Sequence, residues 1–202
     1  MTLPTTEVCP LSAGAFIWHR YDSEVKADLF STALATASGI YLVDPISLDP
    51  NSFSLATRDQ KISGIVVTNA NHCRAAHNFA AQFSAPIYAS AETAISSAIQ
   101  IADGEQLTPE LTVSAIEGAA QGELALYWKG DGGTLVLGDA LINFGSHEFT
   151  FLPAKYCSNP KLMRKSLRKL LAYSFERILF AHGTPIVTKA RSRLAALLND
   201  TP

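Results

Sequence analysis

The chain has 202 residues, 48% of them hydrophobic and 17% charged, which is typical of a globular protein able to bury a sizeable core. Its net charge of −2 disfavours a protein that wraps nucleic acid, although a basic patch could lie within a near-neutral total. No apolar run approaches the roughly 20 residues that a membrane-spanning helix needs, and the first residues lack the pattern of a secretory signal. The cysteines Cys9, Cys73 and Cys157 are scattered and odd in number, so we expect no disulfide framework and a cytoplasmic location.

The first half of the chain predicts strands that alternate with helices. Apolar runs bounded by turn residues predict strands, and apolar residues three or four positions apart predict helices. A polar loop at 69–74 separates a strand from the helix that follows it. We expect strands at 15–20, 26–35, 39–44, 62–68 and 86–89, a loop at 45–51, and helices at 75–84 and 91–99.

The second half predicts further strands and two helices. The sequence Gly-Asp-Gly-Gly at 130–133 predicts a hairpin turn between two of the strands. We expect strands at 111–116, 123–128, 134–137 and 174–181, a helix that begins at 159, and a closing helix at 188–198. One face of the first helix is basic and could attract an anion or a membrane surface, although plain solvation is the commoner explanation. Its cations are Lys161, Arg164, Lys165, Arg168 and Lys169.

This order of elements predicts an α/β (α+β) fold for residues 1–202 as a single domain, with two mixed sheets and helices on their outer sides. Two ionisable residues follow strand-like runs: Asp139 after Gly-Thr-Leu-Val-Leu-Gly and His182 after Ile-Leu-Phe-Ala. Folds of layered helices and sheets place their chemistry at such strand ends. Asp139 and His182 are therefore the primary candidates for catalytic residues.

The order of five segments resembles the metallo-β-lactamase-like hydrolase superfamily. Two of the segments are specific, namely Gly-Asp-Ala-Leu at 138–141 and Ala-His-Gly-Thr-Pro at 181–185. The other three are Leu-Val-Asp-Pro at 42–45, Val-Val-Thr-Asn-Ala-Asn-His-Cys-Arg at 66–74 and Glu-Gly-Ala-Ala-Gln-Gly-Glu at 117–123. The resemblance implies a four-layer αβ/βα sandwich with a two-metal hydrolytic site along one edge, between the sheets.

Most of the metal ligands of that family are absent from this sequence. A two-metal site needs about seven nitrogen and oxygen donors, and neutral Asn, Ala and Arg supply few or none. We therefore predict that the two-metal site is lost, that no metal cofactor is expected, and that the chain is an inactive or divergent homologue with a small-molecule cleft. The family's four histidines fall at Asn69, Asn71, Arg74 and Ala119, and the aspartate of its histidine motif falls at Cys73.

Two alternatives remain for the residues that are left. Arg74 could replace the missing positive charge by forming an ion pair with Asp139, with His182 as a base and Arg74 as an anion clamp. Alternatively, Cys73, Asp139 and His182 could hold one zinc or iron ion and make a mononuclear hydrolase. Arg74 argues against that second arrangement, because a fixed cation repels a metal ion at short range.

The loop 69–74 supplies the predicted ligand-binding residues Asn69, Asn71, His72, Cys73 and Arg74. A nucleophile–base pair of His72 with Cys73 is disfavoured, since neighbouring residues rarely face each other. We expect an unknown small molecule, in some cases anionic, as the ligand, and neither nucleic acid nor membrane as a partner. A homodimer is the default assembly. Among the other histidines, His77 is expected on a helix surface, and His19 and His147 have no evident partner.

Overall fold

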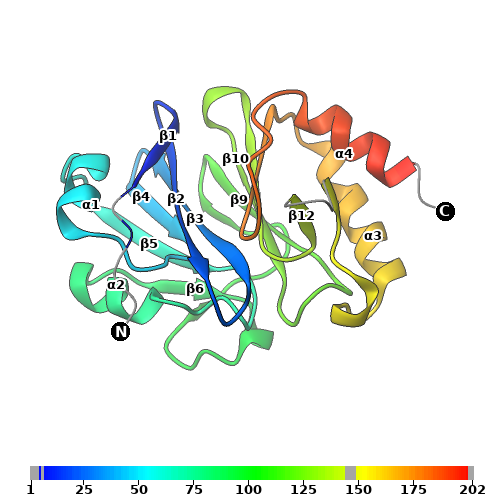
Figure 1. Ribbon diagram of the computed structural model, residues 1–202, viewed down its shortest axis with the longest axis horizontal. Coiled ribbons are helices and arrows are strands. Elements are labelled where there is room, and N and C mark those ends of the chain that lie inside the picture. Colours follow the sequence, from blue (N-terminus) through cyan, green and yellow to red (C-terminus); the bar gives the residue numbers. More distant parts are fainter. Residues whose placement is uncertain (1–4, 6, 144–148, 200–202) are drawn as a thin grey trace.

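The computed structural model describes residues 5, 7–143 and 149–199 and contains two mixed β-sheets with helices on their outer faces (Figure 1). In the first sheet, seven strands follow one another in chain order. The first four strands are antiparallel, and the fourth to the seventh are parallel. These strands are β1 (Cys9–Ser12), β2 (Ala15–Asp22), β3 (Ala27–Thr36), β4 (Gly39–Val43), β5 (Ile62–Val67), β6 (Ile87–Ala89) and β7 (Ile99–Gln100).

The second sheet has five strands in the order β14-β11-β10-β9-β8, and β12 and β13 form a separate two-stranded ribbon. Strands β10 and β11 are antiparallel, whereas β11 and β14 run parallel. The bounds are β8 (Gln106–Thr108), β9 (Leu111–Ala115), β10 (Leu124–Trp128), β11 (Thr134–Leu137), β12 (Leu141–Asn143), β13 (Phe149–Phe151) and β14 (Arg177–Phe180).

Four α-helices cover the outer faces of the sheets, α1 and α2 on the first sheet and α3 and α4 on the second (Figure 1). Their bounds are α1 (Pro50–Thr57), α2 (Ala76–Phe83), α3 (Pro160–Lys169) and α4 (Ala190–Asn199). Short 3-10 turns occur at η1 (Ala91–Thr93), η2 (Gly130–Gly132), η4 (Ala154–Tyr156) and η5 (Leu170–Ala172). In the described ranges, no helix combines the length and the apolar character needed to cross a bilayer.

Three apolar clusters separate the four layers. The middle cluster joins the two sheets through residues such as Val66 and Leu126. One outer cluster packs the first sheet against α1 and α2, with Phe79 among its members. The other packs the second sheet against α3 and α4, with Leu167 among its members. This arrangement is the predicted four-layer αβ/βα sandwich.

Most predicted elements are confirmed, but the helix expected at 91–99 is wrong. Only η1 forms there, because Ala94 takes a left-handed backbone conformation (φ 57°) that ends the turn, and β7 follows. Glu92 anchors this segment to another loop, since its carbonyl oxygen accepts from the Gln121 side chain and its carboxylate accepts from the Gly122 backbone. Tertiary contacts therefore override the local helical pattern.

Helix α1 was not predicted, although its start carries a clear signal. The carboxylate of Asp49 accepts a hydrogen bond from the Ser52 backbone, and Pro50 is the first helical residue. An aspartate cap followed by proline is a common way to begin a helix. The weak amphipathic pattern of this short helix concealed that signal.

Candidate metal centre

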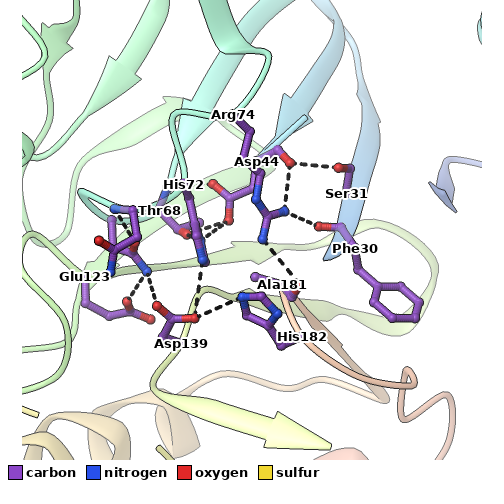
Figure 2. A network of polar contacts seen from close by, with 12 residues as sticks. Phe30, Ser31, Asp44, Thr68, His72, Arg74, Glu123, Asp139, Ala181 and His182 are labelled. Atoms are coloured by element: carbon purple, nitrogen blue, oxygen red, sulfur yellow. Dashed lines mark hydrogen bonds and ion pairs between the residues drawn. The ribbon is translucent and has the colours of Figure 1, made fainter. Parts of the chain in front are cut away.

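The ends of four strands bring the candidate residues together at one edge between the two sheets (Figure 2). Asp44 follows β4 and the loop 68–74 follows β5, and these two strands are parallel neighbours in the first sheet. Asp139 follows β11 and His182 follows β14, which are parallel neighbours in the second sheet. Parallel neighbours end at the same edge of a sheet, so the topology alone collects these side chains.

His72, Asp139 and His182 form a compact group at this edge. His72 Nε2 lies 3.3 Å from Asp139 Oδ1, and His182 Nε2 lies 3.5 Å from the same oxygen. The three candidate ligand atoms all lie within 4.8 Å of one another. Ligands placed 2.0–2.1 Å from a tetrahedral zinc ion would be roughly 3.3 Å apart, so the spacing suits one ion.

Asp44 and Thr68 hold the imidazole of His72 on its Nδ1 side. The Thr68 hydroxyl donates to Asp44 Oδ2 at 2.5 Å, and the Thr68 backbone N–H donates to Asp44 Oδ1 at 2.8 Å. His72 Nδ1 lies 2.9 Å from the same Asp44 Oδ2. With the hydroxyl hydrogen already committed, Nδ1 carries a hydrogen and donates it to Asp44. The ring is thereby fixed with Nε2 facing Asp139 and His182, as second-sphere carboxylates commonly fix metal-ligating histidines.

His72 Nε2 is a buried nitrogen without a hydrogen-bond partner, in a residue that is only 2% exposed. The Asp139 carboxylate is close enough for an ion pair but lies outside hydrogen-bond geometry. Buried polar atoms rarely lack a partner, and such exceptions often mark a site for an ion or ligand. These residues therefore fit one metal ion, with Nε2 as a ligand.

In the absence of a metal ion, burial and neighbouring charges determine the protonation states of His72, His182 and Asp139. Burial lowers the pKa of His72, but the carboxylates of Asp44 and Asp139 outweigh it and raise the pKa to about 9. Burial lowers the pKa of His182 to about 4, despite the opposing charge of Asp139. Burial raises the pKa of Asp139, but contacts with His72 outweigh it and lower the pKa to about 2. At neutral pH, a proton on His72 therefore occupies the place that a metal ion would take, and binding would release it.

The predicted ion pair between Arg74 and Asp139 is wrong. The Arg74 guanidinium donates to the backbone carbonyls of Phe30 at 2.6 Å, Asp44 at 3.1 Å and, weakly, Ala181 at 3.5 Å. No carboxylate in the described chain lies within ion-pair distance of it. The guanidinium instead donates to three carbonyls from both sheets, while the Asp139 carboxylate is already contacted by His72, His182 and Asn69. Arg74 is thus a brace between the sheets, and its charge helps to keep His182 neutral.

Asn69 presents its amide nitrogen, not its oxygen, to the site. Nδ2 donates to Glu123 at 2.8 Å and to Asp139 Oδ2 at 3.1 Å, while Oδ1 accepts from the Asn71 backbone at 2.9 Å. A nitrogen that donates to two carboxylates cannot also bind a cation, so Asn69 supports the site as a hydrogen-bond donor. The Asn71 side chain is exposed, and its role in ligand binding stays a prediction.

Glu123 is a site residue that sequence reasoning missed. Its carboxyl is buried and accepts from the Ala140 backbone at 3.0 Å as well as from Asn69. Burial and the nearby charge of Asp139 raise its pKa to about 8, so it is mainly protonated at neutral pH. In the segment 117–123 the resemblance to the family concerns a histidine position alone, whereas the signal for Glu123 is an acidic residue at the start of an apolar strand. Glu123 also lines an open cavity of about 610 Å³ together with Ala119, Lys155 and Cys157.

The fallback ligand set Cys73, Asp139 and His182 stays a prediction, but the structure groups His72, not Cys73, with Asp139 and His182. Cys73 instead packs against the apolar cluster beneath the first sheet, and burial raises the pKa of its thiol. Neighbouring residues in this loop face opposite ways, which sequence alone did not resolve. The remaining histidines lie elsewhere, with His77 exposed on α2 and His19 stacked on Phe30, while His147 lies outside the described residues.

A model of the metallo-beta-lactamase superfamily matches residues 12–201 of this chain. A comparison with curated proteins gives no significant match. Similar solved structures include the DIM-1 metallo-beta-lactamase, with a TM-score of 0.75 at 12% identity, covering 98% of this chain and 99% of that one. A metallo-beta-lactamase from Erythrobacter litoralis has a TM-score of 0.72 at 16% identity, covering 96% of each chain. The mono-zinc form of FIM-1 from Pseudomonas aeruginosa has a TM-score of 0.71 at 14% identity, covering 99% and 98%.

Proposed function

Because this chain belongs to the metallo-beta-lactamase superfamily, we propose that it is a divergent member in which one metal site replaces the ancestral pair. The proposed ligands are His72, Asp139 and His182. The observation that carries the proposal is the buried Nε2 of His72, which has no hydrogen-bond partner and which Asp44 directs at the other two ligands. A likeness in fold supports it as well, since FIM-1 has a mono-zinc form.

The proposed activity is metal-dependent hydrolysis of a small molecule. A zinc or similar ion held by three protein ligands would supply a polarising charge and an activated water at its open position. Asp44 and Thr68 keep His72 oriented, and the Arg74 brace links Phe30 of the first sheet to Ala181, the residue before His182. Glu123 supplies a neutral carboxyl that can donate or accept a proton at the edge of the adjoining cavity.

The cavity supports a small-molecule ligand. It has the size of a small-molecule site and offers both signs of charge, with Lys155 and Glu117 among its lining residues. An anionic group could pair with Lys155 there, which agrees with the expected ligand class. The three free thiols suit a reducing compartment, so a cytoplasmic location stays our expectation. A homodimer also stays our expectation, because it is the commonest assembly of soluble proteins.

A metal-free binding protein is the second candidate. Both oxygens of Asp139 already have protein partners, since Oδ1 contacts two histidines and Oδ2 accepts from Asn69. A protonated His72 between Asp44 and Asp139 would compensate both carboxylates without any ion. In that case the chain would be an inactive homologue that keeps the cleft.

Metal content separates the two candidates. We would strip the full chain with a chelator, titrate zinc or iron(II), and measure bound metal by mass spectrometry. The one-metal proposal expects saturation at one ion per chain, loss of that ion in His72→Ala, and retention in Cys73→Ala. Saturation at two ions, or equal binding by wild type and His72→Ala, would contradict it, and the absence of binding at pH 8 would favour the metal-free protein.

A further inference from the structure

Charge is distributed unevenly along the chain. Residues 1–153 hold six lysines and arginines against sixteen aspartates and glutamates, whereas residues 154–202 hold ten against two. The second stretch includes α3 and α4, which contact each other over the outer face of the second sheet at one end of the molecule (Figure 1). A total charge near zero therefore conceals one strongly basic end, and local charge governs the encounter with a charged partner.

The cations of α3 are directed outward. Its apolar residues Met163 and Leu167 are buried in the core, which leaves Lys161 and Lys165 exposed on the opposite face. Neither lysine has a carboxylate within ion-pair distance in the described chain. The exposed Arg168 donates to the Leu198 carbonyl, so this contact does not neutralise its charge. The face thus keeps a net positive charge.

Other cations of this part of the chain lie against aromatic rings. The Lys155 ammonium lies 4.6 Å from the ring centre of Tyr156, whose exposed fraction is 59%. The Arg164 guanidinium lies 5.2 Å from the ring centre of Phe151, and a third such pair joins Arg193 of α4 to Phe149. The turn η4 that carries Tyr156 comes just before α3 in the chain, so this exposed ring is close in sequence to the lysines of α3.

We propose that a basic face, formed by Tyr156, Lys161, Lys165 and Arg168, binds single-stranded nucleic acid. Phosphates would contact the lysines and Arg168, and a base would stack on Tyr156, the combination that sequence-tolerant single-strand binders use. The expectation of no nucleic-acid partner came from total charge, which does not report how charge is distributed. An anionic membrane fits less well, because α3 buries its apolar residues and so offers no apolar helix face to insert. A second copy of the chain also fits less well, because a contact between oppositely charged surfaces of two copies would give no role to the exposed ring of Tyr156.

The first test measures how binding depends on salt. Fluorescence anisotropy of the full chain with labelled 20-nucleotide oligo-dT and oligo-U, at 50 to 300 mM salt, should show affinity that falls steeply with salt. The double variant Lys161→Ala/Lys165→Ala should bind about tenfold more weakly and reduce the slope of log affinity against log salt by about 1.4. The control Lys61→Ala/Lys129→Ala removes the same charge from exposed sites outside the basic face and should match wild type.

The second test examines stacking. Tyr156→Ala should weaken binding about tenfold or more, whereas Tyr156→Phe keeps the ring and the affinity. Absence of oligonucleotide binding at 50 mM salt, or equal losses in the two lysine double variants, would overturn the proposal. Binding to phosphatidylserine vesicles without oligonucleotide binding, or salt-sensitive self-association without it, would also overturn it and identify the other partner class. Chelator-treated protein should bind equally well, which separates this inference from the proposed metal site.

Discussion

His72 donates its Nδ1 hydrogen to Asp44 across 2.9 Å, and this contact fixes the direction of Nε2, which has no hydrogen-bond partner. Asp44 is itself fixed by two hydrogen bonds from Thr68, and its backbone takes a left-handed conformation (φ 48°) at the end of β4. Non-glycine residues seldom adopt that conformation, and at functional sites such strain often accompanies a precise side-chain direction. The pair of Asp44 and His72 is thus the structural basis of the proposed metal site.

Replacing Asp44 should weaken metal binding without removing a ligand. Asp44→Asn keeps the size of the side chain but loses the charge that holds His72 Nδ1–H, so we expect zinc affinity to fall about 10- to 100-fold. Competition with a chromophoric chelator would measure the change. Asp103→Asn removes an equal charge from an exposed position and should leave the affinity unchanged. Unchanged affinity in Asp44→Asn would show that the orientation of His72 does not depend on this carboxylate.

Without metal, the protein should lose stability as the pH rises through 9. The pKa of His72 is raised from its ordinary value of 6.5 to about 9, so the folded state binds a proton that the unfolded state has released. This contribution is complete below pH 6.5 and lost by pH 9, and it is on the order of 3 kcal/mol. The raised pKa of Glu123 acts with the same sign, but its contribution is lost by about pH 8.

The comparison that isolates His72 uses the interval from pH 8 to 9. Urea unfolding in the presence of a chelator should show a decline in the free energy of unfolding for wild type that is smaller in His72→Gln. An equal decline in the two proteins would mean that His72 is not protonated in the folded state.

Arg74 should stabilise the fold through backbone carbonyls and should couple only weakly to Asp139. Arg74→Ala removes the donor of three carbonyl oxygens, so the free energy of unfolding should fall by about 2–4 kcal/mol. In a double-mutant cycle with Asp139→Asn, the coupling energy should stay below about 0.5 kcal/mol, because the two side chains make no direct contact. A coupling above 1 kcal/mol would restore the ion-pair hypothesis.

Gly138 should tolerate no side chain. A Cβ atom there would lie 2.6 Å from Thr68 Oγ1, 2.8 Å from Glu123 Oε1 and 3.0 Å from Asn69 Nδ2. Gly138→Ala should therefore displace the polar network, destabilise the fold by about 1–3 kcal/mol and weaken metal binding. Gly132→Ala is the control, because its nearest neighbour would be 3.5 Å away and only its positive φ opposes the change. Thermal unfolding and chelator competition would measure the two effects.

The sequence predicted the architecture because the strands and the core-facing helices carry strong periodic patterns. The runs that became β4, β5, β11 and β14 are almost wholly apolar, and each is followed by a polar residue at the site. The exceptions depended on tertiary contacts, as at Glu92, or on a cap that precedes a weak pattern, as at Asp49. The periodicity of apolar residues reports neither contacts between distant segments nor the residue that caps a helix.

The site was only partly predictable. Asp139 and His182 were identified because they end strands, whereas the choice between His72 and Cys73 depends on which way a loop residue faces. Asp44 provides the missing information, since a buried carboxylate attracts the imidazole across 28 positions of sequence. Glu123 escaped notice for a similar reason, because its partners Asn69 and Ala140 come from other strands' ends.

The Arg74 brace also bears on whether a second metal ion could be engineered into this site. A histidine at position 74 would remove the donor to carbonyls on both sheets before any second ligand set was complete. A single change to histidine at position 69, 71 or 119 would likewise leave the other positions unchanged. Adding that second site would therefore cost stability at position 74 before it brought any gain in chemistry.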